Sequence, residues 1–393
     1  MANLLQDVYL NWTEKELPQK ERTKHVHGLH PYLGKFVPQI PEIFLKLYFK
    51  PGDTILDPFM GSGTTLVESN IADMNAIGID ISLFNCIMVS VKMGKYNIIR
   101  LKYEINDALT KLYNILNKED SKKDVKIKQE CLFNDCDINT DDLTLHTDNE
   151  YINKWYKERS IKELLAYKYI IKNGNYEYLD VLKIILSKAA RSARLVAHNE
   201  LDWPNKPVRE PYYCSKHKRT CYPTSEALKF IRRYSTETFN RIKDFSKIRK
   251  DREVNILHGD SRNINIDKTI DGVFTSPPYL GLIDYHLQHE YAYHFLELEM
   301  HKEKEIGPME KGQSIKARED YKQGIIEVLK NTNKYLKPGG RIIIVVNDNK
   351  NLYPDIIKDS GLIEEDRVSR EVNRRTGRRS TEFTEDIIIC KKA

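Results

Sequence analysis

Apolar and polar positions follow two different patterns along this chain of 393 residues. Near its start, the apolar run 54–59 leads into a glycine turn at 60–63, as a buried strand does before a helix. The following residues predict a helix from about Thr64 and a second strand over 75–81, with Asp80 near its end. Strand, glycine turn, helix, strand and terminal acid form the opening βαβ unit of a nucleotide-binding α/β sheet.

The alternation of strands and helices stops between residues 101 and 250. Amphipathic periodicity predicts mostly helices there, over 101–118, 159–172, 179–197 and 224–248. Residues 119–150 are polar and acidic and predict a loop. Four prolines between the last two helices predict a stretch without helix.

Strand and helix patterns alternate again from residue 254. They predict a turn at 336–340, helices over 287–299 and 354–361, and strands over 254–260, 271–279, 341–348, 362–372 and 384–392, of which the last two form a hairpin. We therefore predict an α/β fold, a doubly wound Rossmann-like sheet of six or seven strands with a mostly helical insertion. Residues 1–100 and 251–393 form the two halves of the sheet domain, and 101–250 form the insertion.

Composition favours a protein that folds in a reducing compartment. Hydrophobic residues make up 40% and charged residues 31% of the chain, and its six cysteines are spaced irregularly, unlike a disulfide framework. The sequence has neither a secretory apolar region nor a run approaching the ~18–20 apolar residues of a membrane span. We therefore expect a cytoplasmic protein that does not cross a membrane.

Positive charge is concentrated in one segment. Residues 151–250 contain 23 Lys and Arg against 10 Asp and Glu, a net charge of +13 within a chain of net charge +6, so all other residues sum to −7. The overall charge does not require a polyanionic partner, but its distribution marks the insertion as the basic part.

The glycine turn has the chemistry of a nucleoside site. Gly63 is followed by Thr-Thr and not by Lys, which excludes a phosphate-binding Walker loop, and the third glycine of the dinucleotide fingerprint is absent. Asp80 follows Gly61 by 19 residues and can bind ribose hydroxyls. Asp57 beside the turn disfavours a phosphate and suits a cationic or zwitterionic nucleoside such as S-adenosylmethionine.

A second motif, Thr275-Ser276-Pro277-Pro278-Tyr279, follows an apolar strand. Consecutive prolines force the chain out of the sheet in a rigid, extended conformation. The Ser276 hydroxyl and the Pro277 carbonyl can accept hydrogen bonds from an exocyclic amine, and Tyr279 can stack on the ring that carries the amine. Alone, the motif is equally compatible with an ordinary turn beside a packed tyrosine.

Together, DPFMGSGTT and TSPPY resemble the signature pair of the amino-group DNA methyltransferases, which methylate cytosine N4 or adenine N6 with S-adenosylmethionine. HPYLGKFVP (30–38), HGD (258–260) and LKPGGRIIIVV (336–346) resemble further family motifs. The resemblance covers about residues 30–100 and 251–393. It implies the catalytic residues Ser276, Pro277, Pro278 and Tyr279. It also implies the cofactor-binding residues Phe36, Asp57, Pro58, Phe59, Gly61, Gly63, Thr64, Asp80, Ile81, Asp260 and Thr275.

The residue before the two prolines points to the target base. In this family Asp or Asn at that position is typical of adenine-N6 enzymes, whereas Ser in TSPPY is typical of cytosine-N4 enzymes. Cytosine-C5 methylation needs a thiolate nucleophile in a Pro-Cys turn, and no cysteine of this chain follows a proline. An exocyclic amine can attack the methyl group directly, so the reaction needs no covalent enzyme intermediate and no metal.

The resemblance also assigns the basic segments to DNA. The cofactor half precedes the catalytic half in this chain, which places the presumed target-recognition region within 101–250. Basic residues there and in a terminal cluster are expected to contact DNA phosphates, namely Arg191, Arg194, Lys216, Lys218, Arg219, Arg374, Arg375, Arg378 and Arg379. A solvated charged face is the alternative for each group.

Two features lie outside these motifs. The spacing Cys214-x2-His217-x3-Cys221 is compatible with three ligands of a structural zinc, but no fourth ligand is evident, so the sequence assigns no metal. Asp284 and Tyr285 follow the catalytic motif and are further candidates for the wall of the base pocket.

The sequence thus predicts a DNA methyltransferase that modifies cytosine N4 at a short specific site in duplex DNA after flipping the base. An adenine-N6 enzyme and, from another class, a non-catalytic DNA-binding protein on the same fold are the alternatives. A cognate restriction endonuclease is a possible partner.

Overall fold

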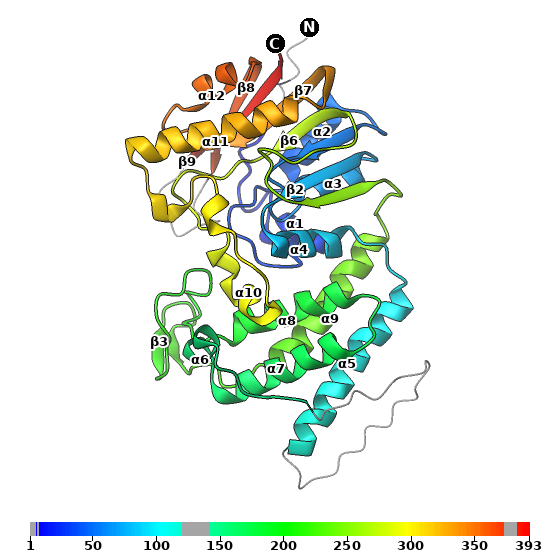
Figure 1. The fold of residues 1–393 in the computed structure, drawn as a ribbon, viewed down its shortest axis with the longest axis vertical. Helices are drawn as coiled ribbons and strands as arrows, with labels where there is room; N and C mark the ends of the chain where they lie inside the picture. Colours follow the sequence, from blue (N-terminus) through cyan, green and yellow to red (C-terminus); the bar gives the residue numbers. More distant parts are fainter. Residues whose placement is uncertain (1–4, 6–7, 120–141, 373–382) are drawn as a thin grey trace. The chain divides into compact units, whose positions relative to one another are not determined.

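The computed structural model describes residue 5 and residues 8–119, 142–372 and 383–393. The chain divides into two compact units (Figure 1). The sheet unit comprises Met1–Gly94, Asp244–Gln288 and Met300–Ala393, and the helical unit comprises Lys95–Lys243 and His289–Glu299. Segment His289–Glu299, which the sequence analysis assigned to the sheet domain, therefore belongs to the helical unit.

Seven strands in the described part of the sheet unit form one sheet in the order β5-β2-β1-β6-β7-β9-β8. Their bounds are β1 Thr54–Asp57, β2 Asn75–Asp80, β5 Val254–His258, β6 Ile270–Thr275, β7 Leu336–Val346, β8 Leu362–Val372 and β9 Phe383–Lys392. The pairs from β5 to β7 are parallel, and β9 is antiparallel to both β7 and β8. The prediction of a doubly wound, Rossmann-like α/β sheet is confirmed.

Alternation along the central strands divides their side chains between two buried faces. Leu56, Val273, Ile342 and Ile344 lie in one core, together with apolar residues of a helix on that face. Their sequence neighbours Ile55, Phe274, Ile343 and Val345 lie in the core on the other face. Since both faces of the sheet are buried, each central strand has a continuous run of apolar residues.

The helices of the sheet unit are α1 Gln19–Arg22, α2 Gln39–Tyr48, α3 Thr64–Ile71, α4 Leu83–Met93, α11 Ile315–Asn333 and α12 Tyr353–Asp359. Short 3-10 turns span His25–Gly28, Leu287–His289, Lys302–Lys304 and Met309–Lys311. Sequence analysis did not identify α11, which runs alongside the sheet in Figure 1 and buries Tyr321, Ile325 and Leu329. Its sequence is highly charged elsewhere, which masks the apolar stripe.

The expected turn at 336–340 is instead the start of β7. Leu336 pairs with Ile270, and a register shift follows before Gly272 pairs with Arg341. The Pro-Gly-Gly sequence therefore forms an irregularity inside the strand, as bulges accommodate an extra residue without ending a ladder.

The helical unit contains α5 Ile98–Glu119, α6 Glu150–Trp155, α7 Glu158–Asn173, α8 Leu179–Ala193, α10 Glu290–Leu296 and, up to Lys243, α9 Leu228–Ser246. The stretch expected to lack helix contains a short antiparallel hairpin of β3 Tyr212–Cys214 and β4 Arg219–Cys221. Across the described residues, no helix has the combined length and apolar character required to cross a membrane.

Candidate active site

The two sequence motifs meet at one edge of the sheet. Strand β1 lies between β2 and β6, and it pairs with β6 through Ile55–Gly272 and Leu56–Val273. The strand order reverses here, and such a switch point is where open α/β sheets bind ligands. The glycine turn follows β1 and the Ser-Pro-Pro-Tyr segment follows β6, so neighbouring strand ends carry them.

A pocket of about 860 Å³, measured with its open mouth, lies at these strand ends. Its wall includes eleven residues that the sequence predicted for the site, namely Phe36, Pro58, Phe59, Gly61, Thr64, Asp80, Ile81, Asp260, Ser276, Pro278 and Tyr285. Tyr32, Asn85, Lys304, Glu305 and Ile306 also line the pocket, although the sequence did not single them out as site residues. Tyr32 lies in the motif of residues 30–38 that supplied Phe36, whereas Lys304, Glu305 and Ile306 belong to a segment that no motif covers.

Glycine is required at two positions of the turn. Gly61 has a φ of +49° and Gly63 a φ of +75°, both in the left-handed region. A Cβ on Gly61 would lie 2.8 Å from the Tyr32 hydroxyl, and one on Gly63 would lie 2.8 Å from the Val89 methyl groups. The turn therefore passes close to its neighbours, and Gly63 provides the N-cap position of α3.

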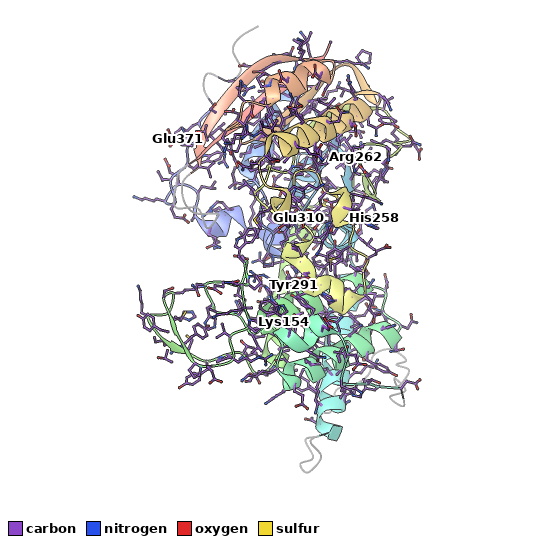
Figure 2. All side chains as sticks on the ribbon, turned by 60° about the vertical axis from the view of Figure 1, so that its left-hand side comes forward. Lys154, His258, Arg262, Tyr291, Glu310 and Glu371 are labelled. Atoms are coloured by element: carbon purple, nitrogen blue, oxygen red, sulfur yellow. The ribbon has the colours of Figure 1, made fainter. Side chains whose placement is uncertain are left out.

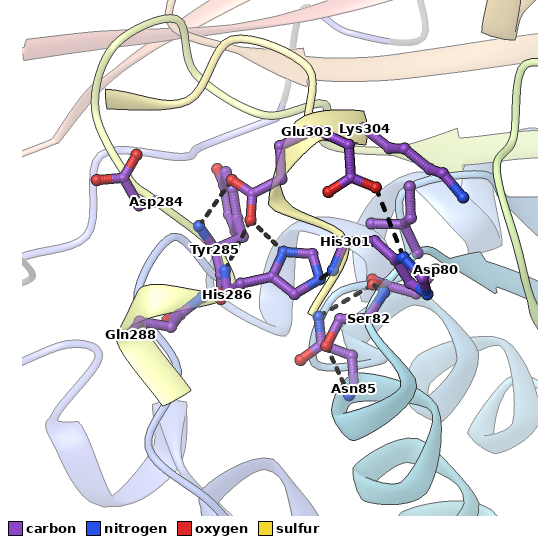
Figure 3. A network of polar contacts seen from close by, with 12 residues as sticks. Asp80, Ser82, Asn85, Asp284, Tyr285, His286, Gln288, His301, Glu303 and Lys304 are labelled. Carbon is purple, nitrogen blue, oxygen red and sulfur yellow. Dashed lines mark hydrogen bonds and ion pairs between the residues drawn. The ribbon is translucent and has the colours of Figure 1, made fainter. Parts of the chain in front are cut away.

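Asp80 is fixed at the end of β2, and its carboxylate lines the pocket. It accepts hydrogen bonds from the Gly61 amide at 2.8 Å, the Ser82 amide at 2.8 Å and the Asn85 side chain at 3.1 Å (Figure 3). Burial raises its pKa to about 6 despite these donors. Two carboxylate oxygens have about four acceptor positions, so this group retains acceptor capacity for a ligand.

Asp57 and Thr275, both predicted to bind the cofactor, are buried behind the pocket wall, where they bond to each other. Asp57 Oδ1 accepts hydrogen bonds from the Thr275 hydroxyl at 2.7 Å and the Phe59 amide at 3.1 Å. Burial raises the pKa of Asp57 to about 6. The Asp57–Thr275 pair links the ends of β1 and β6, so these residues position the two motifs. Gly63 also does not line the pocket, and it supports the turn as the N-cap of α3.

Asp260 lies on the pocket wall and is paired with Arg262, which Figure 2 labels. Arg262 Nε lies 2.9 and 3.0 Å from the two Asp260 oxygens. Burial would raise the pKa of Asp260, but the hydrogen bonds and charge of Arg262 outweigh it and hold the pKa below its usual range. Asp260 is therefore an ionised group at the pocket.

The Ser-Pro-Pro-Tyr segment divides between two hollows. Ser276 and Pro278 line the main pocket, whereas Tyr279 lines a neighbouring one together with Tyr321, Asn347 and Tyr353; Pro277 lines neither. The Tyr279 hydroxyl donates to Glu385 Oε1 at 3.0 Å. Arg370 in turn donates to Glu385 Oε2 at 2.6 and 2.8 Å. This buried chain of contacts fixes the tyrosine ring beside the serine.

The segment after the motif completes the wall with Tyr285 and His286. Glu305 accepts hydrogen bonds from the Tyr285 amide at 3.1 Å and the His286 amide at 2.8 Å, and it also contacts the His286 ring. Figure 3 shows His286 between Tyr285 and His301. Asp284, the other candidate, is buried and accepts from the Glu310 amide, so it stabilises the loop and does not line the pocket.

The predicted DNA-contacting residues differ in accessibility. Lys216, Lys218 and Arg219 are exposed on the β3–β4 hairpin. Arg194 is 4% exposed, donates to the Leu201 carbonyl at 2.7 Å and stacks over the Tyr291 ring, which Figure 2 labels. Because burial keeps this side chain from a phosphate, the prediction for Arg194 is wrong.

Arg191 is mostly buried and paired with Asp202, so it too has a structural role in this conformation. Arg374, Arg375, Arg378 and Arg379 lie outside the described residues.

The pocket fits the nucleoside cofactor that the sequence predicts. Phe36, Phe59 and Ile81 provide apolar surface, and carboxylates of Asp80 and Asp260 provide acceptors. A side chain at position 61 would narrow the pocket, because its Cβ would lie 2.8 Å from the Tyr32 hydroxyl. S-adenosylmethionine has an apolar nucleoside face, hydroxyl donors and a cationic sulfonium, and this set of residues provides a complement to each.

Comparison with known proteins gives the family. The N6/N4 methyltransferase family model, described as DNA methylase, matches residues 5–92. The Type II methyltransferase M.MjaII of Methanocaldococcus jannaschii is 41% identical over 95% of this chain and 82% of its own length. The Type II methyltransferase M.BsoBI of Geobacillus stearothermophilus is 25% identical over 68% of this chain and 52% of its own length.

Solved structures show more distant likenesses. TrmN from Thermus thermophilus is 11% identical, with a TM-score of 0.33 over 92% of this chain and 50% of its own. The rRNA methyltransferase AviRa from Streptomyces viridochromogenes is 10% identical, with a TM-score of 0.32 over 92% of this chain and 88% of its own. On the strength of the 41% identity over nearly its whole length, the chain belongs to the family of amino-group DNA methylases, whose methyl donor is S-adenosylmethionine.

Proposed function

We propose that the chain is a site-specific DNA methyltransferase that modifies the exocyclic N4 amine of cytosine in duplex DNA after flipping the base. The observation that carries this proposal is the position of Ser276, on the pocket wall at the end of β6 and beside the glycine turn of β1. A neutral serine at the position where adenine-N6 enzymes typically have Asp or Asn favours cytosine.

The residues around Ser276 are suited to hold a flipped base. The Ser276 hydroxyl and the Pro277 carbonyl are the acceptors for the target amine, and the Tyr279 ring is the stacking surface. Glu385 and Arg370 support this assignment, because Glu385 accepts from the tyrosine hydroxyl and Arg370 holds Glu385, which fixes the ring before DNA arrives. S-adenosylmethionine supplies an electrophilic methyl group, and the chain contributes chiefly by orienting the amine toward it.

DNA binding is assigned to the helical unit in this proposal. The hairpin turn combines Lys216, Lys218 and Arg219 with the exposed rings of Tyr213 and Tyr222, which are 68% and 73% exposed. Cations that attract the backbone and aromatic surfaces beside them are typical of nucleic-acid contacts. Both relatives are named Type II methyltransferases, which supports a cytoplasmic restriction–modification role with a cognate endonuclease.

Nucleoside analysis tests the target base directly. DNA from cells that express the chain is digested to nucleosides and compared with DNA from cells that express the Ser276→Ala variant. N4-methylcytosine that depends on Ser276 is the expected product. N6-methyladenine would overturn the cytosine assignment and leave the family unchanged. DNA without either base, from protein that binds S-adenosylmethionine and duplex DNA, would favour a non-catalytic binding role.

A further inference from the structure

The helical unit contains a cluster of four metal-ligating side chains, in a segment that no motif of the family resemblance covers. His198, Cys214, His217 and Cys221 each direct one ligand atom into a common space, and these four atoms lie within 4.8 Å of one another. The spacing of the last three suggested a metal in the sequence, but a fourth ligand was missing. His198, which precedes Cys214 by 16 residues, is the fourth.

The distances within the cluster agree with tetrahedral coordination. His217 Nδ1 lies 3.6 Å from Cys214 Sγ and 3.5 Å from Cys221 Sγ. Zinc–sulfur bonds of about 2.3 Å and zinc–nitrogen bonds of about 2.0–2.1 Å at the tetrahedral angle separate sulfur from nitrogen by about 3.6 Å. The His198 and His217 rings are 4.7 Å apart and steeply inclined, at 64°, so they approach the space from different directions.

The hairpin also orients the fourth ligand. The Tyr212 hydroxyl lies 2.8 Å from His198 Nδ1 and accepts the His198 amide at 3.0 Å. With Nδ1–H donated to this hydroxyl, Nε2 keeps its lone pair for a metal, which is the usual arrangement for a ligating histidine. Tyr212 pairs with Cys221 in the hairpin, so one short element holds Cys214, His217 and Cys221 as well as the group that orients the fourth ligand.

We propose that His198, Cys214, His217 and Cys221 form a structural zinc site. Two thiolates and two imidazoles suit zinc better than a hard cation such as magnesium or calcium. Four protein ligands close the coordination sphere, so the site leaves no open position for catalysis. The two thiolates neutralise the dication, and the net positive charge of the hairpin turn is unchanged.

The surrounding segment needs such a link, because it has almost no core. From His198 to Glu226, a range that the structure describes in full, Cys214 and Cys221 are the only buried residues. A segment that cannot bury apolar surface commonly depends on a metal or on disulfides. Zinc would close the chain between His198 and the hairpin and hold the exposed turn at Lys216–Arg219 in one conformation.

Metal analysis of the full-length protein, purified without a histidine tag or chelator, tests the site independently of methyl transfer. We expect one zinc per chain in the wild type and in Ser215→Ala, a matched control on the same turn. In Cys221→Ser the content is expected to fall at least tenfold, whereas His198→Cys, which replaces one zinc ligand with another, should retain zinc.

Chelation of the wild type keeps the test valid if the cysteine variants do not fold. Removal of the metal should expose bonds between residues 198 and 226 to limited proteolysis, and added Zn²⁺ should restore protection. Added Co²⁺ should produce the intense visible absorption of a tetrahedral thiolate complex, which is absent from Cys214→Ser. Less than a tenth of a zinc per wild-type chain, with no Co²⁺ absorption, would overturn the proposal and leave only thiol–imidazole hydrogen bonds. Zinc retained in the Cys214→Ser/Cys221→Ser double variant would also overturn it.

Discussion

The sheet unit and the hairpin of the helical unit place their functional side chains by opposite means. At the strand ends of the sheet unit, each carboxylate is held by two or more donors, as Asp80 is by Gly61, Ser82 and Asn85. On the hairpin, Lys216, Lys218 and Arg219 are exposed, and the nearby buried side chains are two cysteines. The sheet unit therefore fixes individual carboxylates in position, whereas the hairpin presents exposed positive charge.

Because of this difference, we expect the two regions to respond differently to substitution. A buried, hydrogen-bonded group loses its partners when it is replaced, and each orphaned partner adds a desolvation cost of about 1–3 kcal/mol. An exposed cation loses only its own screened attraction to a phosphate. Single changes in the sheet unit should therefore have large effects, whereas changes on the hairpin should be small and additive.

The largest expected effect is that of Tyr279→Ala. The variant loses base stacking, at about 1–3 kcal/mol, and the hydrogen bond from the tyrosine hydroxyl to Glu385. Together these losses should reduce kcat/KM for DNA by about 10²–10³-fold. Tyr279→Phe keeps the ring and should lose less than about tenfold. Methyl-transfer kinetics, with calorimetry of cofactor binding, would test this, with Tyr9→Ala as an exposed control. Equal losses in the Ala and Phe variants would show that the hydroxyl, and not the ring, is what matters.

Asp80→Asn should weaken cofactor binding next most strongly. The amide cannot accept from all three present donors, and the loss of charged hydrogen bonds predicts a Kd increase of about 10–10²-fold. The wild-type pKa of about 6 also predicts that the wild-type Kd for S-adenosylmethionine is constant above about pH 7 and rises as the pH falls through 6, because protonation removes the charge. Calorimetric titrations between pH 5 and pH 8 should show this dependence in the wild type and not in the variant.

Asp57→Asn should change the pH dependence of stability. The folded pKa of about 6 lies above the ordinary value of 3.8, so this carboxyl favours the folded state at low pH and loses that contribution as pH rises through 6. We compare the free energy of unfolding of the variant with that of the wild type. The difference, variant minus wild type, should be about 2 kcal/mol larger at pH 7 than at pH 4.5. Urea denaturation of both proteins at the two pH values measures this; a difference of the opposite sign would contradict the burial argument.

The smallest effect is expected on the hairpin. Replacing Lys216, Lys218 and Arg219 together by Ala should raise the Kd for duplex DNA by about tenfold at low salt. It should also lower the slope of log Kd against log salt by up to about 3, since each phosphate contact contributes about 0.9. Binding titrations at several salt concentrations test this, with Lys15→Ala/Lys20→Ala as a control on exposed charge. An unchanged salt dependence would remove the hairpin from the DNA interface.

Much of the sheet could be predicted because local patterns and global packing agree there. Uninterrupted runs such as Ile342–Val346 are buried on both faces, and a buried strand of a parallel sheet has that pattern wherever it lies. The glycine turn was predictable for a similar reason, since φ values of +49° and +75° favour glycine and a Cβ at either position would lie 2.8 Å from a neighbouring side chain. In contrast, α11 escaped detection because its many charged residues obscure an apolar stripe that packs only in the folded sheet.

Residues close together in the chain were enough to predict the strand, turn and helix that carry the first motif, the chemistry of the glycine turn and of Ser-Pro-Pro-Tyr, and three of the four zinc-ligand candidates. Which side chains of distant segments meet is evident only in the folded protein. Folding turned Asp57 and Thr275 into a link between strands, buried Arg194 under Tyr291, and brought His198 to the cysteines. Contacts between distant segments depend on how the chain packs, and no local pattern encodes that packing.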